Sequence, residues 1–149
     1  MNVKVFFALL LAVAAVSSKK ISYQRCATSS RGRIIYVDVS PCDQEPCVFR
    51  RGSKETIRVS FIPDELITEA KIYAYGIKPG FWRVPLPLDH NVCQGYGLTC
   101  PMKPIVPVNF VYSLNIKSMY PPGYYRLEVL IKDQNDNLVI CGIIGLEVA

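Results

Sequence analysis

Six cysteines are the residues of this chain with the clearest capacity for chemistry: Cys26, Cys42, Cys47, Cys93, Cys100 and Cys141. An even number of cysteines in a secreted chain is typical of a disulfide framework formed in an oxidising compartment. The sequence alone does not choose among the many ways in which six cysteines can pair. Closeness along the chain favours Cys42 with Cys47 and Cys93 with Cys100, which leaves Cys26 for Cys141.

Catalytic chemistry finds little support in the remaining residues. If every cysteine is oxidised, no thiolate is left to act as a nucleophile. The single histidine, His90, stands in a segment rich in proline and turn residues, where we expect a loop residue rather than a general base. The sequence has no Gly-x-Ser-x-Gly motif and no glycine-rich phosphate loop. We therefore expect no enzyme activity and no cofactor.

Two kinds of segment could bind a metal ion, and both fit that role poorly. The spacings from Cys42 to Cys47 and from Cys93 to Cys100 lack the close pairs common in zinc sites. The polar run from Asp133 to Asn137 resembles the start of a calcium loop, but Leu138 and Ile144 stand where that loop needs glycine and glutamate. A five-residue hairpin loop explains the run better. We expect no metal site.

The first 18 residues are typical of a secretory signal peptide. A short basic start is followed by an almost wholly apolar stretch from Val5 to Val16, and Ser17 and Ser18 supply small residues for cleavage. This apolar stretch is shorter than the roughly 20 residues that span a bilayer. We expect residues 19–149 to form one domain of a secreted, extracellular protein, with the endolysosomal lumen as an alternative location.

The charge balance argues against nucleic acid as a partner. The formal net charge of +5 falls to +4 when Lys4 leaves with the signal peptide. Basic residues are mixed with acidic ones, so no segment has the character of a nucleic-acid-binding arm. The mild positive excess is compatible with contact with anionic membrane surfaces, but the expected interpretation is an ordinary solvated surface.

Strict alternation of apolar and polar residues recurs along the chain and predicts β-strands. The clearest examples are 57–61, 110–116, 125–131 and 140–148, with shorter candidates at 34–39 and 71–75. Turn signals such as Arg51-Gly52-Ser53, Lys78-Pro79-Gly80 and Tyr120-Pro121-Pro122-Gly123 separate them. No helical period is evident. The expected fold is all-β, an immunoglobulin-like two-sheet β-sandwich.

The segment from Ile77 to Leu88 is rich in apolar residues but does not alternate cleanly. It contains Phe81 and Trp82, and Pro85 and Pro87 remove ladder donors, which indicates an edge strand or a loop. Its apolar residues must cover the edge of the core, meet a partner or line an opening. On packing grounds alone, a well-filled sandwich is the default expectation.

Several short motifs in a fixed order change that expectation. They are Val39-Ser40-Pro41-Cys42, Glu45-Pro46-Cys47, Arg51-Gly52, Gly80 with Val84-Pro85-Leu86-Pro87 before Cys93, Cys100-Pro101, Ile116-Lys117-Ser118-Met119-Tyr120-Pro121 and Leu138-Val139-Ile140-Cys141. With these motifs the chain resembles the ML lipid-recognition domain family over essentially all of the mature sequence. Within that family it is similar to the Niemann–Pick type C sterol-transfer branch and to the group 2 mite allergens.

The resemblance implies a β-sandwich whose sheets separate to hold a lipid in an internal apolar cavity. It also implies the pairing Cys26–Cys141, Cys42–Cys47 and Cys93–Cys100. In the sterol-binding branch, three positions guard the mouth of the cavity, and they fall here on Leu86, Ile116 and Tyr120. The branch usually has phenylalanine where this chain has Leu86, and Phe81 and Trp82 are candidates to supply the missing aromatic surface. Phe61 and Phe110, from the inner faces of strands, complete the expected lipid-binding set.

The sequence thus favours a monomeric carrier that binds and transfers a sterol or similar hydrophobic lipid, with a membrane surface or a lipid receptor as its docking partner. One alternative is an innate-immune protein that recognises microbial lipids, or an allergen-like fatty-acid binder. The other is a structural secreted domain with a closed core.

Overall fold

The protein is seen here in a computed structural model that describes residues 17–88 and 91–149. Most of the expected signal peptide, and His90, lie outside the described residues. The strands are β1 (Lys19–Ile21), β2 (Gln24–Arg25), β3 (Gly32–Ser40), β4 (Cys47–Phe49), β5 (Lys54–Pro63), β6 (Lys71–Lys78), β7 (Trp82–Pro85), β8 (Val108–Asn115), β9 (Gly123–Lys132) and β10 (Leu138–Val148).

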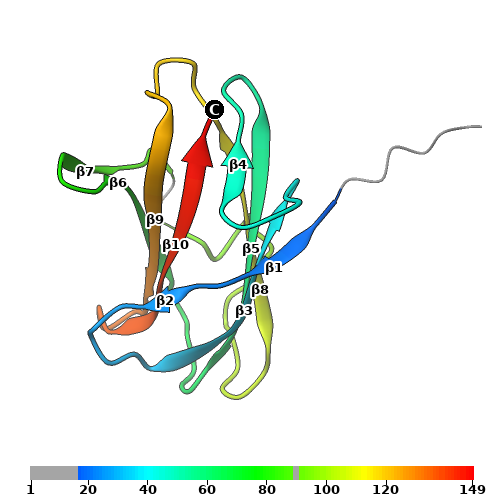
Figure 1. The fold of residues 1–149 in the computed structure, drawn as a ribbon. Helices are drawn as coiled ribbons and strands as arrows, with labels where there is room; N and C mark the ends of the chain where they lie inside the picture. The colour runs from blue at the N-terminus through cyan, green and yellow to red at the C-terminus, as the bar shows by residue number, and fades with distance from the viewer. Residues whose placement is uncertain (1–16, 89–90) are drawn as a thin grey trace, which may run out of the picture.

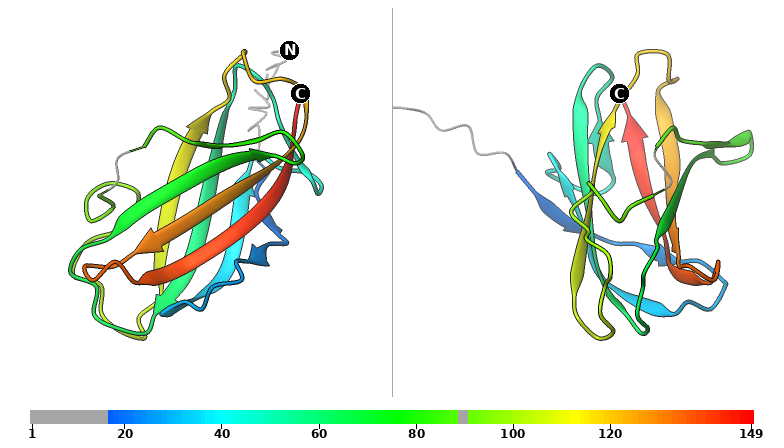
Figure 2. Two further views of the ribbon diagram at one scale, coloured as in Figure 1. Left: turned by 90° about the vertical axis from the view of Figure 1, so that its left-hand side faces the viewer. Right: turned by 180° about the vertical axis from the view of Figure 1, so that it is seen from behind.

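These strands form two sheets that pack face to face (Figures 1 and 2). The first sheet has the order β1-β3-β5-β8 and is antiparallel throughout. The second has the order β2-β10-β9-β6-β7, and the short strand β4 runs parallel to the end of β10. No residue in 17–88 or 91–149 is helical, so no helix there could cross a membrane. The predicted immunoglobulin-like sandwich is confirmed.

The alternation in the sequence separates the inner face of each sheet from the outer face. On β9, the alternate residues Tyr125, Leu127, Val129 and Ile131 are buried, and on β5 Ile57, Val59 and Phe61 are buried. Successive side chains of a strand point to opposite faces, so each alternating run supplies one side of the inter-sheet core. The free energy gained by burying this apolar surface is what holds the two sheets together.

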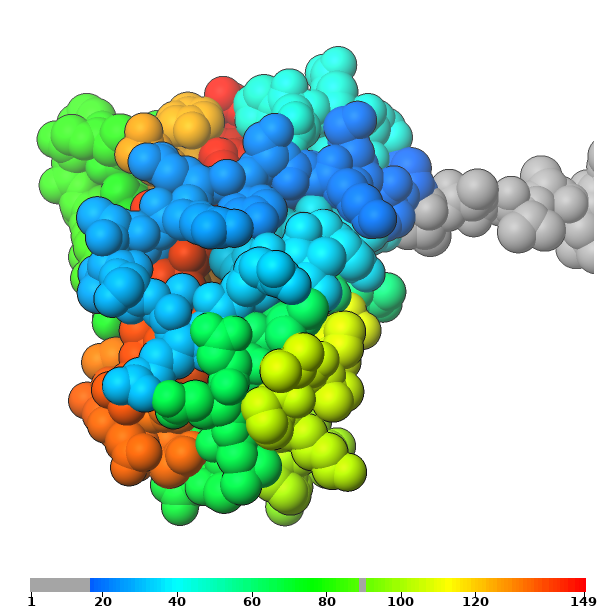
Figure 3. All heavy atoms as spheres, turned by 90° about the horizontal axis from the view of Figure 1, so that it is seen from below, coloured from blue at the N-terminus to red at the C-terminus, as the bar shows by residue number. Residues whose placement is uncertain are grey.

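The N-terminal segment closes one edge of the sandwich. Strand β1 pairs with β3 in the first sheet and β2 pairs with β10 in the second, so the chain between them crosses from sheet to sheet. The crossing is seen in blue in Figures 1 and 3. Beside it, β4 covers the same edge of β10 with residues 47–49. These segments therefore cover the core at this edge. At the opposite edge of the second sheet, β6 and β7 cover it.

Three disulfides join the cysteines in the expected pairs: Cys26–Cys141, Cys42–Cys47 and Cys93–Cys100. Cys26 directly follows β2, and Cys141 lies within β10. Their Cα atoms are 5.5 Å apart, although the residues are separated by 115 positions in the chain. This bridge fixes the crossing N-terminal segment to the strand that ends the fold.

The polar run from Asp133 to Asn137 is the five-residue loop of the β9–β10 hairpin, as predicted. Asp133 is buried, and its Oδ1 accepts hydrogen bonds of 2.9 Å from the backbone N–H groups of both Asn135 and Asn137. The carboxylate therefore binds its own loop.

Candidate functional site

An apolar cavity of about 260 Å³ opens at one end of the sandwich, where the β6–β7 hairpin faces the end of β8 and the start of β9. Six strands (β4, β6, β7, β8, β9 and β10) and two loops contribute to its wall. The lining residues are Phe49, Gly76, Trp82, Val84, Pro85, Leu86, Pro87, Leu114, Ile116, Tyr120, Tyr125, Arg126, Leu127, Leu146 and Val148. An opening of this composition suits a ligand that is itself apolar, with few polar groups to orient it.

Ile116 is held at the mouth by the turn that precedes β5. Its backbone N–H donates to the carbonyl of Ser53 at 2.9 Å, and its carbonyl accepts from the N–H of Gly52 at 2.7 Å. Gly52 adopts φ +81°, a left-handed conformation that glycine takes at little cost. The sequence motif Arg51-Gly52 therefore positions a residue 64 places later in the chain, and the side chain of Ile116 is only 3% exposed.

Leu86, Tyr120 and Trp82 stand around the same opening. The N–H of Leu86 donates to the carbonyl of Ala74 at 2.8 Å, which ties the chain beyond β7 back to β6. The ring of Trp82 lies 5.6 Å from the ring of Tyr125, centroid to centroid. Four of the seven residues that the sequence suggested for lipid binding therefore line one cavity: Leu86, Ile116, Tyr120 and Trp82.

The other three residues lie elsewhere. Phe61 and Phe110 are completely buried in the core between the sheets and do not line the cavity. Phe110 packs against the rings of Tyr96 and Tyr112 instead. Phe81 is 80% exposed at the tip of the β6–β7 hairpin, which projects from the body of the protein (Figures 1 and 2). The aromatic surface at the mouth comes from Trp82 and Tyr125.

Several cavity residues were not singled out from the sequence. Phe49, Leu146 and Val148 come from the paired ends of β4 and β10. Tyr125 belongs to a run whose alternation indicates an inward side chain, but nothing in that pattern distinguishes the cavity from the filled core. The Tyr125 hydroxyl donates to the carbonyl of Pro121 at 2.6 Å and so braces the loop beside Tyr120.

A second, much smaller apolar gap lies deeper between the sheets. Its volume is about 20 Å³, and its wall shares Leu127 with the cavity at the mouth. A gap of this size with only apolar walls has no polar partners for water. The interior is therefore close to filled beyond the mouth.

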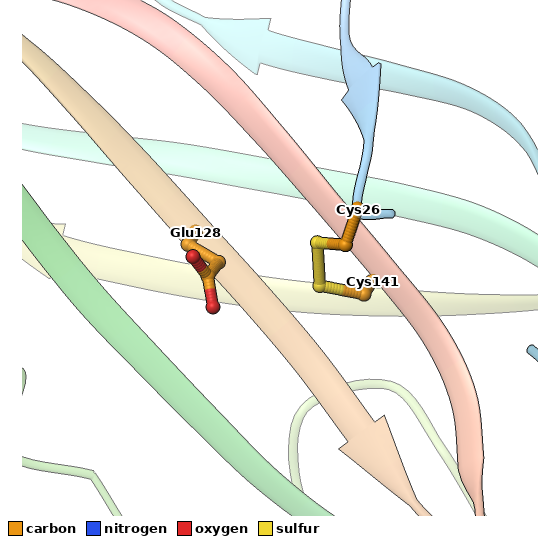
Figure 4. A group of neighbouring side chains, drawn as sticks. All are labelled: Cys26, Glu128 and Cys141. Carbon is orange, nitrogen blue, oxygen red and sulfur yellow. A yellow bond between two sulfur atoms is a disulfide. The ribbon is translucent and has the colours of Figure 1, made fainter. Parts of the chain in front are cut away.

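One group of potential metal-ligating residues occurs in the described part of the chain: Cys26, Cys141 and Glu128 (Figure 4). The two sulfur atoms are bonded to each other and are therefore not thiolates. Glu128 is paired with Arg83, with 3.0 Å between carboxylate oxygen and guanidinium nitrogen. This group lacks the donors of a metal site.

The model of the ML domain family matches residues 20–148 of the chain. The chain belongs to the ML family. An ML relative in zebrafish (Danio rerio), NPC intracellular cholesterol transporter 2, is 28% identical over 134 residues, covering 89% of this chain and 88% of the relative. The mite group 2 allergen Lep d 2 of Lepidoglyphus destructor is 26% identical over 116 residues, covering 78% of this chain and 79% of the allergen.

The ML fold is also seen in a solved structure. The crystal structure of a Niemann-Pick type C2 protein from the Japanese carpenter ant superposes with a TM-score of 0.77 at 20% identity, covering 87% of this chain and all of that one. The predicted family membership is confirmed.

Proposed function

We propose that this ML protein binds a sterol or similar hydrophobic lipid in the cavity between its sheets and carries it between membranes. The observation that supports this most is the apolar opening of about 260 Å³ at the mouth positions of an ML chain. Relatives whose names describe cholesterol transport point the same way. No covalent chemistry is needed, because binding rests on removing apolar surface from water, at about 25 cal/mol per Å².

A whole sterol needs more room than the cavity offers, because small-molecule sites typically measure roughly 300–1,000 Å³. Strand β7 is the element best able to provide it. It is an edge strand held by four residue pairs to β6, whereas β8, β9 and β10 are each paired over eight residues or more. A ligand would move β7 outward and extend past Leu127 toward the deep gap.

The residue at position 86 does not restrict the bound lipid to sterols. Leu86 replaces the aromatic ring that the sterol-binding branch usually has, while Trp82 and Tyr125 supply ring surface nearby. Tyr120 and Arg126 are the residues at the opening that could bind a polar head group. We infer a mouth that accepts acyl chains as well as sterols.

The three disulfides suit a secreted protein or one of the endolysosomal lumen. We propose that it is made with a signal peptide over residues 1–18 and acts as a monomer, residues 19–149 forming one domain.

The direct test is to purify the protein from its native source, extract it with organic solvent and identify the released lipid by mass spectrometry. A sterol or fatty acid in molar proportion supports the carrier. A microbial lipid supports the recognition role instead. Absence of any extracted lipid, together with no response of Trp82 fluorescence to added sterol or fatty acid, contradicts both and leaves a closed structural domain.

Val84→Asp is expected to weaken lipid binding about 10- to 100-fold while leaving the fold intact. Val84 lines the cavity but is 41% exposed, so the change places a charge beside the ligand without disturbing the core. Titration of the protein with a fluorescent sterol measures the dissociation constant. Val106→Asp is the matched control, because Val106 is 46% exposed and lies away from the cavity. Equal sterol affinities in the two variants would show that the lipid does not bind in this cavity.

Phe81→Ser is expected to slow transfer of lipid to vesicles several-fold without changing equilibrium binding. Phe81 stands 80% exposed at the tip of a hairpin beside the mouth, where an aromatic side chain can enter a membrane interface. Vesicle co-sedimentation and a fluorescent transfer assay measure the effect.

The matched control is Ile105→Ser. Ile105 is 77% exposed, and its N–H donates to the carbonyl of Pro63, at the opposite end of β5 from the mouth. Equal slowing in both variants would show that general surface hydrophobicity, rather than the hairpin, drives membrane contact.

A further inference from the structure

Glu55 is a carboxyl group buried on the inner face of the first sheet. It is the second residue of β5, only 1% exposed, and alternates in phase with the core residues Ile57 and Val59. Its Oε2 is the only buried side-chain oxygen or nitrogen in residues 17–88 and 91–149 that lacks a hydrogen-bond partner. Burial raises the pKa of Glu55 to about 7. A buried unpaired carboxyl costs folding free energy, which calls for an explanation.

Glu55 lies between two hollows of opposite character. Directly across from it on β8 is Leu114, which lines the apolar cavity. Glu55 itself lines a separate crevice of about 430 Å³, formed with the loop between β3 and β4. The other walls of that crevice include the polar residues Asp43, Gln44, Arg50 and Ser53. One side of the Glu55 carboxyl group therefore faces Leu114 and the apolar cavity, and the other side faces the polar crevice.

The charged groups around Glu55 leave it unpaired in this structure. From the loop after β3, Asp43 lines the crevice. Its Oδ1 accepts a hydrogen bond of 2.6 Å from Ser17 Oγ in this structure, but Ser17 belongs to the proposed signal peptide, so Asp43 loses this partner in the mature protein. Directly after β4, the exposed Arg50 lines the same crevice without bonding to Glu55. Strand β8 has no charged residue, and on β5 Lys54 and Arg58 alternate to the outer face, as does Glu147 on β10.

We propose that Glu55 is a proton-binding site through which pH regulates lipid affinity, with the neutral carboxyl favouring the lipid-bound state. The proposal rests on the lipid-carrier function above. Lipid in the cavity would exclude water from the inner face beside Leu114, which makes a charge on Glu55 more costly. Without lipid, the ionised carboxylate can take water and the Arg50 guanidinium from the crevice. Because linkage is reciprocal, if lipid strengthens proton binding then ionisation weakens lipid binding by the same factor.

The test uses two uncharged fluorescent probes, dehydroergosterol and a pyrene-labelled fatty alcohol, so that the ligand itself does not titrate. Their dissociation constants are measured with the mature protein from about pH 5 to about pH 8. We expect the wild-type constant to rise about tenfold over this range, and that of Glu55→Gln, which mimics the neutral carboxyl, to stay nearly flat. Glu69→Gln, at an exposed glutamate, should keep the wild-type dependence.

Calorimetry of wild-type protein in buffers of different ionisation enthalpy gives a second measure that needs no variant. Near pH 7, probe binding should take up a fraction of one proton. Two results would overturn the inference and leave the carrier function intact. One is a wild-type dissociation constant that does not change with pH, together with no proton uptake. The other is the same pH dependence of the dissociation constant in Glu55→Gln as in wild type. No binding of either probe at any pH overturns the carrier function and this inference together.

Discussion

Replacing Cys26 and Cys141 together by serine is expected to lower the free energy of unfolding by about 5 kcal/mol. The bridge joins residues 115 positions apart, and in the chain-entropy model a loop of this length restricts the unfolded chain strongly. It also anchors the segment that crosses between the sheets. Urea or guanidinium unfolding followed by circular dichroism gives the change.

The Cys93–Cys100 bridge provides the matched control, because its residues are only 7 positions apart. The same model gives that bridge about 2.5 kcal/mol, so its double serine variant should be clearly more stable than the variant without Cys26–Cys141. Equal losses in the two variants would show that loop length is not the source of the stabilisation.

Raising the pH from about 4.5 to about 7 is expected to destabilise the lipid-free protein through Glu55, by at most about 3 kcal/mol. Burial raises the pKa of Glu55 from 4.5 to about 7 in the folded state. Between these two values the folded protein holds a proton on Glu55 that the unfolded chain has lost, so stability falls as pH rises. Below about pH 4.5 and above about pH 7, the contribution of Glu55 to the free energy of unfolding no longer changes with pH. Water in the crevice beside Glu55 reduces the size of the effect.

Chemical unfolding at several pH values, with wild type and Glu55→Gln compared at each, isolates this contribution from all other titrating groups. The variant should gain stability relative to wild type as the pH rises through this range. The exposed Glu69→Gln variant should follow wild type throughout. A constant difference between wild type and Glu55→Gln would show that the carboxyl is not held neutral by burial.

The fold followed from local signals in the sequence. Alternation at 57–61 and 125–131 specifies which side chains face inward, because side chains in a strand have a period of two, and the turn residues mark where each run ends. The run at 133–137 indicates a hairpin loop because Leu138 and Ile144, which follow it, stand where a calcium site needs glycine and glutamate. The disulfide pairs were favoured by closeness along the chain, with Cys26 and Cys141 left for each other.

The sequence by itself thus predicted the sandwich and the family, and it favoured the disulfide pairs without excluding other pairings. Through the family it suggested Leu86, Ile116 and Tyr120 as mouth positions. Only the tertiary structure decided which apolar residues border the open space. Phe61 and Phe81 are both phenylalanines that the sequence suggested for lipid binding. In the structure Phe61 is completely buried, whereas Phe81 projects into solvent.

Glu55 shows the same limit more sharply. In the sequence it is one glutamate among the charged residues of a strand, and a pattern of polar and apolar letters does not reveal an unpaired carboxyl on an inner face. Its burial depends on where β4 and the loop before it close over the start of β5, which is a matter of packing between distant segments. Local patterns assign a side chain to a face of the sheet, but the filling of that face is decided by residues far away in the chain.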